Sequence, residues 1–374
     1  MSRPVRVLHC LSSITSGGVE RRHLEIVRHL PSPGFLHRFI GTEADGPIAD
    51  ALQREGAEIT TLGPVRSVLL PGRYRRGVAV ARAWHPDLIH GAVMEGTVMA
   101  TVVGRRLGIP VVTEETSDPQ NRRPMGHRLA KLVAQSATRC VAVSPAVGRY
   151  LTEELGVPSD KVSVVVNGVS EPKPLPPTEA TELRAALGIG ADDVVIGTVC
   201  RLFDDHKRVT DLIEAFSTLA MKFPKSHLLI VGSGPDRSLM KDAARKTGNA
   251  TRIHFVERRI PADPYYAIMD VFALASSREA FGLVAAEAMR AGLPVVATRV
   301  GGLAEIVDDG VTGHLVRPLV PAQLARALEG LVSDNATRDR MGEAGRRKAE
   351  REYSVERYAQ DVERLYVDVL SARR

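Results

Sequence analysis

The sequence predicts an α/β fold made of two Rossmann-like, doubly wound domains that face a central cleft. With 374 residues, 44% of them apolar, the chain is too long for one ordinary core. Short apolar runs alternate with helical patterns, as in βαβ units, and the alternation restarts after a proline-rich segment. We predict an N-terminal domain (1–170), a linker (171–190), a C-terminal domain (191–353) and a last helix (354–374) that packs on either domain.

The first domain is expected to form a parallel sheet. Its predicted strands are Val5–Cys10, Phe39–Thr42, Asp87–His90, Pro110–Thr113, Cys140–Ser144 and Lys161–Asn167, with a helix over Glu20–Leu30. The prolines of Ser170–Thr178 then suit an extended connector.

The second domain repeats the pattern. Its predicted strands are Val194–Cys200, His227–Gly232, Arg252–Val256, Val271–Ala275, Pro294–Thr298 and Gly313–Val316, with helices over Val209–Phe223 and Val355–Leu370. In such sheets ligands bind beyond the carboxyl ends of the strands, so polar motifs at these ends are the candidate sites.

Composition narrows the class of protein. No run approaches the roughly 18 apolar residues of a membrane-spanning helix, and the first residues lack the apolar core of a signal peptide. We therefore expect a cytoplasmic protein. Cys10, Cys140 and Cys200 are widely spaced in or beside apolar runs, which favours reduced core thiols over disulfides or a metal site.

The whole excess of positive charge lies in the first half. Residues 1–175 hold 22 Lys and Arg against 16 Asp and Glu, and the remainder holds 28 of each. This asymmetry predicts either a peripheral contact of the N-terminal domain with an anionic membrane face or lipid-linked phosphate, or a merely solvated surface. The densest basic cluster is Arg73–Arg76, but seven Tyr and one Trp in the chain offer no aromatic platform for nucleic acid.

A glycine-containing loop follows the first predicted strand. Gly17 and Gly18 would let a substrate approach the backbone, and the helix that begins there offers free N–H groups to phosphate or sugar oxygens. The pattern is neither the dinucleotide fingerprint nor a Walker loop. An ordinary tight turn is the alternative reading.

Two cations follow the first strand of the second domain. Arg201 and Lys207 lie between a predicted buried strand and a helix, where fixed positive charges would stabilise a diphosphate leaving group. A solvated basic loop is the alternative. The adjacent Asp204 and Asp205 raise the possibility of a metal, but we expect the cations to neutralise the diphosphate without one.

The segment Glu279–Glu287 is the central motif. A helix of small residues is expected to begin near Gly282, so that the N–H groups of Gly282, Leu283 and Val284 point at a diphosphate. Glu279, just ahead, can reach sugar hydroxyls. Glu287 lies about 7 Å further along the helix, which suits a ribose. The alternative is that one of these glutamates is only an acid at the start of the helix and that the other lies on its solvated face.

Together these motifs resemble the retaining glycosyltransferases of family 4, which have the GT-B fold. The resemblance rests on Glu279–Glu287, Ala288–Val296, Gly301–Glu305, Asp309–Gly313, Arg201 and Lys207, Val231–Pro235, Asn167–Val169 and Gly17–Gly18.

The resemblance implies roles for these residues. Catalytic roles would fall to Arg201 and Lys207, which hold the donor diphosphate, and to Glu279, which holds the transferred sugar. Donor binding would add Gly17, Gly18, Gly232 with Gly234, Phe281, Gly282, Leu283, Val284 and Glu287, with Phe255–Ile260 bordering the base. The family needs no enzyme nucleophile, because the leaving phosphate accepts the acceptor's proton.

The chain departs from the family pattern on the acceptor side. Where many members carry a His, this sequence has Glu114 and Glu115, which would bind acceptor hydroxyls or an amine, act as a base, or form a surface acid pair. His90 is either a packed histidine or a substrate contact. Asn121–Pro124 adds cations that either steer a phosphorylated acceptor or are simply exposed.

The sequence thus predicts a metal-independent hexosyltransferase without cofactor. It would use a nucleoside-diphosphate sugar, with UDP-hexose or UDP-N-acetylhexosamine favoured, and a saccharide, lipid-linked or small-molecule acceptor. The alternatives are a sugar-nucleotide epimerase or phosphorylase on the same fold, and a catalytically silent sugar-nucleotide-binding module. A nicotinamide dehydrogenase is disfavoured, because the dinucleotide glycine pattern is missing after both first strands.

Overall fold

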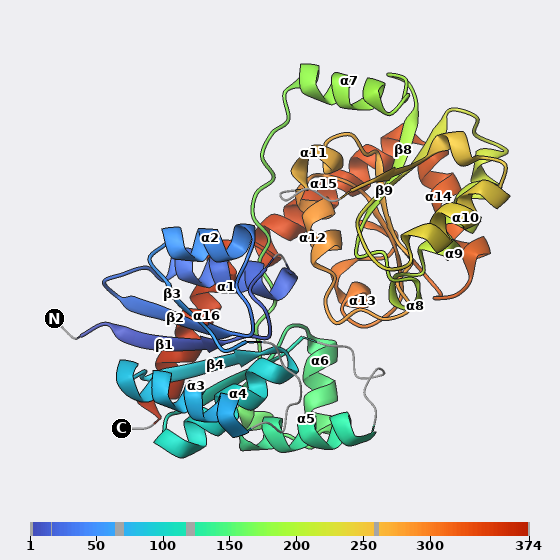
Figure 1. Cartoon of the computed structure of the whole chain (residues 1–374). Helices are drawn as coiled ribbons and strands as arrows, with labels where there is room; N and C mark the ends of the chain where they lie inside the picture. Colours follow the sequence, from blue (N-terminus) through green and yellow to red (C-terminus); the bar gives the residue numbers. More distant parts are fainter. Residues whose placement is uncertain (1–2, 16, 64–70, 117–123, 258–261, 373–374) are drawn as a thin grey trace. The chain divides into compact units, whose positions relative to one another are not determined.

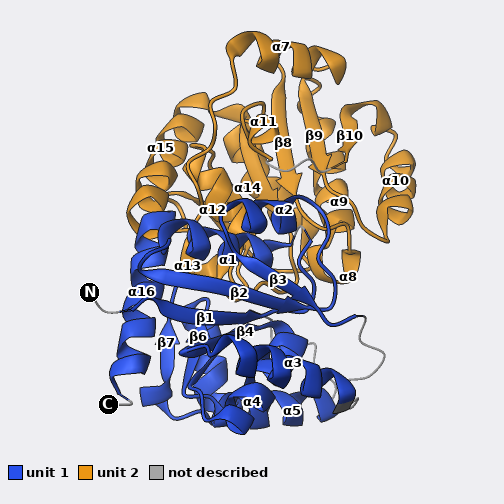
Figure 2. Ribbon diagram, turned by 60° about the vertical axis from the view of Figure 1, so that its left-hand side comes forward, with its two compact units in different colours: residues 1–168, 355–374 blue, residues 169–354 orange. Residues whose placement is uncertain are grey.

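The structure is a computed structural model that describes residues 3–15, 17–63, 71–116, 124–257 and 262–372. The chain forms two compact units (Figure 2). Unit 1 comprises Met1–Gly168 and Val355–Arg374, and unit 2 comprises Val169–Ser354. Each unit is a parallel sheet with helices on its faces (Figure 1). The predicted fold class, two doubly wound α/β domains, is confirmed.

In the described part of unit 1 the sheet has seven strands, in the order β3-β2-β1-β4-β5-β6-β7, all parallel. The order changes direction between β1 and β4. This is the switch point at which doubly wound sheets bind ligands. The strands are β1 (Val5–Cys10), β2 (Phe35–Gly41), β3 (Glu58–Thr61), β4 (Leu88–Ala92), β5 (Val111–Glu115), β6 (Arg139–Ala142) and β7 (Val162–Val164).

Helix α16 completes unit 1, although it is the last helix of the chain (Figure 1). Its buried Tyr358, Val362, Leu365 and Tyr366 join a core with residues of α1 and of the strands. The apolar spacing of three and four residues gives α16 this buried face. The helices of the unit are α1 (Gly18–His29), α2 (Pro47–Arg54), α3 (Pro71–Trp84), α4 (Val93–Leu107), α5 (Pro124–Ser136), α6 (Pro145–Arg149), the π-turn η2 (Tyr150–Glu154), the 3-10 turn η3 (Ser159–Lys161) and α16 (Val355–Ser371).

In unit 2 the described strands form a six-stranded parallel sheet in the order β10-β9-β8-β11-β12-β13. Its switch point lies between β8 and β11. The strands are β8 (Val194–Val199), β9 (Ser226–Val231), β10 (Ile253–Val256), β11 (Val271–Leu274), β12 (Val295–Thr298) and β13 (Gly313–Val316). All six were expected, within one residue at either end.

The predicted linker contains a helix. Residues 171–190 include helix α7, whose first residue is Pro177 and whose first turn carries Glu179; proline and an acid both suit the start of a helix. Helix α7 spans Pro177–Ala186. The other helices of unit 2 are α8 (Asp204–Lys207), α9 (Val209–Ala220), α10 (Arg237–Lys246), the 3-10 helix η4 (Ala250–Arg252), α11 (Asp263–Tyr266), α12 (Leu283–Arg290), α13 (Leu303–Ile306), α14 (Pro321–Ser333) and α15 (Asn335–Glu352).

Two sequence expectations concern the whole chain. None of the helices in the described ranges combines the length and apolar character that crossing a membrane requires. The three cysteines are buried and form no disulfide, and burial raises the pKa of Cys10 to about 12. They are therefore core thiols, as expected.

Candidate active site

Lys207 and Glu279 meet at the switch point of unit 2. Lys207 ends α8, after β8, and Glu279 lies in the loop after the neighbouring strand β11. Lys207 Nζ donates a short hydrogen bond to Glu279 Oε2, and the two side chains are 19% and 17% exposed. Burial alone would lower the pKa of Lys207, but Glu279 outweighs it and raises the pKa above its ordinary value. The site therefore holds a fixed ammonium group.

Arg201 adds a second cation at the end of β8. Its side chain is exposed, and the guanidinium carbon lies 6.0 Å from the ring centroid of Phe203, at the limit of a cation–π contact. Among the described residues no carboxylate forms an ion pair with it. Arg201 can therefore turn its charge to an anionic ligand.

The adjacent aspartates are both committed elsewhere. Asp204 accepts hydrogen bonds from the backbone N–H (2.9 Å) and the hydroxyl (2.6 Å) of Thr210 in the first turn of α9. Asp205 pairs with Arg278. One carboxylate thus bonds to the first turn of a helix, and the other pairs with an arginine.

Helix α12 begins where the sequence predicts. Gly282 has φ = +110°, a left-handed conformation that favours glycine, and α12 starts at Leu283. Ala285, Ala286 and Ala288 are fully buried, which lets the helix lie close to the sheet. Its first N–H groups have no intrahelical partner, so they can donate to an anion.

Phe281 directly precedes the glycine at the start of α12. Its side chain is buried, and its ring lies edge-on to that of Tyr353, at 5.8 Å between centroids. It packs the base of the loop, so any donor contact of Phe281 falls to its backbone.

Gly301 and Gly302 pack against the backbone of the loop that carries Glu279. Gly302 N–H donates to the carbonyl of Glu279 (3.0 Å), and a Cβ on Gly301 would lie 1.9 Å from that same carbonyl oxygen. Gly232 and Gly234 act similarly, because a Cβ on either would lie within 2.3 Å of the carbonyl oxygens of Cys200 or Leu202. These glycines let neighbouring loops pack tightly around the cations.

Glu287 is oriented by a residue that sequence reasoning missed. Tyr266, on the short helix α11, donates its hydroxyl to Glu287 Oε2 (2.8 Å), and both side chains are buried. The contact spans 21 residues and has no sequence signal. This hydrogen bond orients the Glu287 carboxylate on helix α12.

We expect Glu287→Ala to raise the KM for the sugar nucleotide about 10- to 100-fold, because a lost charged hydrogen bond costs about 1.5–3 kcal/mol, with little change in kcat. Tyr266→Phe should raise KM only a few-fold, since it frees the carboxylate without removing it. Steady-state kinetics over donor concentration measures both. An unchanged KM in Glu287→Ala contradicts the ribose role.

In unit 1, Gly17 and Gly18 lie between β1 and helix α1, beside the switch point. Gly17 is the N-cap of α1, and Gly18 is its first residue. A Cβ on Gly17 would lie 2.2 Å from a carboxylate oxygen of Glu20. The Glu20 side chain therefore lies against Gly17 at the start of this twelve-residue helix, and the donor role of Gly17 and Gly18 stays a prediction.

Glu114 is not the surface acid that the sequence left possible. It lies on β5, 3% exposed, and accepts a short hydrogen bond from Arg22 of α1, which also donates to the side-chain oxygen of Asn167. Burial alone would raise the pKa of Glu114, but Arg22 and His23 lower it to about 2. The carboxylate is therefore ionised and bound by Arg22 inside the unit.

His90 is a packed histidine. It is 1% exposed, its Nδ1 lies 2.7 Å from the hydroxyl of Tyr366 on α16, and burial lowers its pKa to about 3. His9 and His37 lie on the same buried face, where burial lowers the pKa of His37 to about 4 and that of His9 well below its ordinary value. Sequence reasoning missed these two histidines, together with Arg22 and His23.

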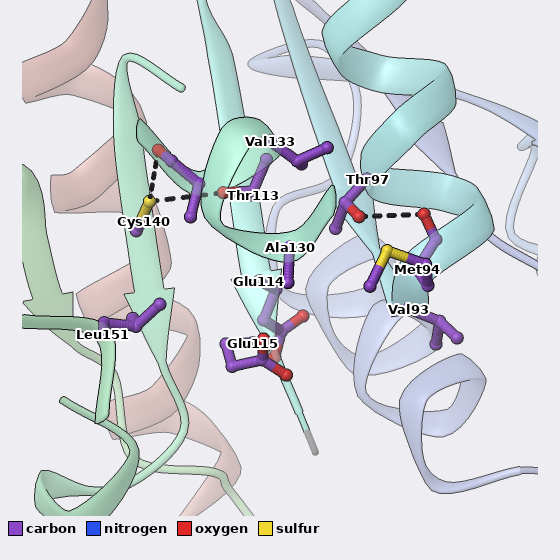
Figure 3. Close-up of a pocket in the computed structure, with 11 residues that line it drawn as sticks. Val93, Met94, Thr97, Thr113, Glu114, Glu115, Ala130, Val133, Cys140 and Leu151 are labelled. Carbon is purple, nitrogen blue, oxygen red and sulfur yellow. Dashed lines mark hydrogen bonds between the residues drawn. The ribbon is translucent and has the colours of Figure 1, made fainter. Parts of the chain in front are cut away.

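Glu115 is the acceptor-side candidate that remains accessible. It is partly exposed and lines a pocket at the end of β5 (Figure 3). Figure 3 shows Val93 and Met94 on one side of Glu115 and Leu151 on the other. The pocket is lined by Val93, Met94, Thr97, Thr113, Glu114, Glu115, Ala130, Val133, Ala134, Cys140 and Leu151.

Three expectations fall partly outside the described residues. They are the cations of Asn121–Pro124, of which only Pro124 is described, the base-bordering segment Phe255–Ile260 after residue 257, and the residues next to the basic cluster before residue 71. Within that cluster Arg76 donates to the carbonyl oxygen of Leu62 (3.3 Å), which gives it a structural contact.

Known proteins match both halves of the chain. The model of "Glycosyltransferase Family 4" matches residues 16–171, and that of "Glycosyl transferases group 1" matches residues 179–348. The D-inositol 3-phosphate glycosyltransferase of Corynebacterium urealyticum is 34% identical over 262 residues, which cover 67% of this chain and 61% of that protein. The N-acetyl-alpha-D-glucosaminyl L-malate synthase of Bacillus anthracis is 29% identical over 219 residues, 59% of this chain and 57% of that one. The chain thus spans less than two thirds of these curated relatives.

Solved structures support the fold. Anabaena Alr3699/HepE in complex with UDP and glucose has a TM-score of 0.86 at 24% identity, covering 97% of this chain and 100% of that one. WaaG, a glycosyltransferase involved in lipopolysaccharide biosynthesis, has a TM-score of 0.76 at 20% identity. The match covers 96% of this chain and 99% of that one. With both units matched by family models and the whole architecture matched by such structures, the chain belongs to family 4 of the glycosyltransferases and has the GT-B fold.

Proposed function

We propose that the protein is a retaining, metal-independent glycosyltransferase. It moves a hexose or N-acetylhexosamine from a UDP-sugar to an acceptor hydroxyl, in the synthesis of a glycan, glycolipid or secondary metabolite. The observation that carries the proposal is the Lys207–Glu279 pair at the switch point of unit 2. It joins a fixed cation for the diphosphate to a carboxylate for the sugar.

Each residue of the donor site has a role in this chemistry. As the bond between the anomeric carbon and the diphosphate oxygen breaks, negative charge grows on the diphosphate. Lys207, Arg201 and the free N–H groups of α12 stabilise that charge, while Glu279 and Glu287 accept hydrogen bonds from sugar and ribose. The acceptor hydroxyl attacks from the face that the phosphate leaves and gives its proton to a phosphate oxygen, so the configuration is retained.

Two observations support the finer parts of the proposal. Asp204 and Asp205 are engaged by Thr210 and Arg278, which leaves charge neutralisation to the cations. HepE, a protein of the same fold, has been crystallised in complex with UDP-glucose, which makes UDP the first donor base to test. The acceptor is assigned to unit 1, where Glu115 lines the pocket.

The test begins with the donor. UDP, GDP and ADP are compared at one common concentration. A ligand at 100 times its Kd stabilises the fold by about 2.7 kcal/mol, so the nucleotide with the lowest Kd, which we expect to be UDP, should give the largest thermal shift. UDP-glucose and UDP-N-acetylglucosamine are then incubated with inositol 3-phosphate or L-malate, the acceptors in the names of the relatives, and with a panel of other alcohols.

Release of UDP together with a product that keeps the α-anomeric coupling in proton NMR supports the proposal. A new sugar nucleotide without acceptor indicates an epimerase, consumption of inorganic phosphate indicates a phosphorylase, and binding without turnover across the panel indicates a silent module. Glu279→Ala is the site control: turnover at the wild-type rate in a folded variant contradicts the site assignment.

A further inference from the structure

The two faces of the sheet of unit 1 carry different charges. Helices α3, α4 and α5 lie side by side on one face (Figure 1 and Figure 2), and side chains of α3 and α4 pack there with Leu8 and Ile89. Helices α1 and α16 pack with the neighbouring strand residues, Val7 and Leu88, on the other face, and α2 packs beside α1. The helices α3, α4 and α5 contain eight Lys and Arg and one acid, Glu95, whereas α1, α2 and α16 contain six Lys and Arg and seven Asp and Glu. The net positive charge of these six helices therefore lies on one face.

Six exposed cations on the first of these faces have no ion pair or side-chain hydrogen bond in the described part of the chain. On the other face, Arg28 of α1 pairs with Glu25 (3.0 Å), and Arg364 of α16 pairs with Asp361 (3.6 Å). The unpaired charges make the exposed side of α3, α4 and α5 attractive to an anionic surface. We call this side the basic face, and its six cations are Arg75, Arg82, Arg105, Arg106, Arg128 and Lys131.

Helix α5 adds two exposed apolar side chains to the basic face. Met125 and Leu132 are 78% and 66% exposed. They lie about two turns apart, so both project from one side of the helix, with Arg128 between them along the chain. Helix α5 contains no Asp or Glu. Apolar tips beside cations on an acid-free helix are typical of helices that lie in the headgroup region of a membrane, where the cations meet anionic headgroups and the apolar tips meet acyl chains.

The composition of the basic face favours lipid over nucleic acid. Proteins that bind single strands of nucleic acid stack the bases on aromatic rings. The aromatic rings of α3, Tyr74 and Trp84, pack partly buried against the core, and α4 and α5 contain no Phe, Tyr or Trp. Exposed aliphatic side chains offer no ring to a base, but they gain free energy when they leave water for a bilayer.

We propose that the basic face binds an anionic lipid bilayer, with α5 in the headgroup region and Met125 and Leu132 inserted toward the acyl chains. The inner side of the same helix carries Ala130 and Val133, which line the pocket together with Glu115. The docked protein would thus offer this pocket to acceptors at the membrane surface. That consequence rests on the proposed function, whereas the docking itself does not depend on it.

Co-sedimentation of the full chain with lipid vesicles tests the docking. Vesicles of phosphatidylcholine alone are compared with vesicles of an equal mixture of phosphatidylcholine and phosphatidylglycerol, at low and at physiological ionic strength. We expect the protein to sediment with the mixed vesicles only, and the binding constant to fall as salt screens the cations. A Leu132→Trp variant reports insertion, because its tryptophan emission should shift to shorter wavelength with mixed vesicles, and Trp84 is the only other Trp in the chain.

Substitutions on α5 separate the contributions of charge and of insertion. Arg128→Gln/Lys131→Gln should lower the binding constant for mixed vesicles about 30-fold, since each cation near an anionic surface contributes about fivefold. Met125→Gln/Leu132→Gln should lower it about tenfold and should abolish the part of the binding that persists when salt is added.

Helix α10 of unit 2 supplies the matched control. It also exposes a leucine, Leu239 (53%), and two cations, Arg245 and Lys246. Arg245→Gln/Lys246→Gln removes the same charge and should leave vesicle binding unchanged. An equal loss of binding in this variant, or wild-type protein that does not sediment with mixed vesicles, overturns the proposal. RNA that stays bound at a salt concentration that releases the vesicles assigns the face to nucleic acid and also overturns it. The wild-type results decide even if a variant fails to fold.

Discussion

Lys207→Ala is expected to lower kcat about 10²- to 10³-fold, the usual effect of removing one fixed donor that stabilises charge in a transition state. Lys207 is the partly buried cation at the switch point, and its pairing with Glu279 keeps it charged. Because charge on the diphosphate is greatest as the glycosidic bond breaks, the loss should appear in kcat more than in the donor KM. Steady-state release of UDP from the donor that the thermal screen selects measures it.

Lys222 gives the matched control. It also pairs with a carboxylate of unit 2, Glu329, at 2.9 Å, but on the surface, where its side chain is 60% exposed. Lys222→Ala should leave kcat and KM unchanged, since exposed ion pairs contribute about 0–1 kcal/mol to stability. If a folded Lys207→Ala variant retains more than about a third of wild-type kcat, Lys207 is not the diphosphate ligand that catalysis needs.

The strands of both sheets were readable from the sequence because buried parallel strands are continuous apolar runs. Strand β3 was missed: its sequence, Glu58-Ile-Thr-Thr61, lies at the edge of the sheet and has no such run. Helix α7 was missed because the prolines around residue 176 read as an extended connector, although proline also suits the first turn of a helix.

The candidate donor site was readable as a set of residues, but its contacts were not. Lys207 and Glu279 each follow a predicted strand, yet they are 72 positions apart, and only the adjacency of β8 and β11 makes them a pair. One of the readings left open for Glu114, a surface acid, is wrong because its partner, Arg22, is 92 positions away in the basic run of a helix. A carboxylate at a strand end looks exposed until the arginine that buries it is known.

This buried pair supports the second large prediction. Glu114→Ala leaves the Arg22 guanidinium, 4% exposed, without its charge partner, and should lower the free energy of unfolding of unit 1 by about 3–5 kcal/mol. The apolar double variant Arg22→Met/Glu114→Leu should recover most of this loss, because no unpaired charge remains buried. Urea unfolding at pH 7 measures the free energy of unfolding of each variant.

The same pair predicts the pH dependence of stability. Folding lowers the pKa of Glu114 from an ordinary 4.5 to about 2, so its ionised form stabilises the fold fully above about pH 4.5. That contribution is lost as the pH falls from about 4.5 to about 2, because the unfolded chain binds the proton first. The double variant should lack this part of the acid transition. Glu58→Ala, which removes the exposed partner of Arg38, should keep it. Its free energy of unfolding at pH 7 should fall by less than about 1 kcal/mol. If Glu114→Ala is no less stable than Glu58→Ala, the buried pair does not hold α1 to β5, and the acid sensitivity of the unit arises at other carboxylates.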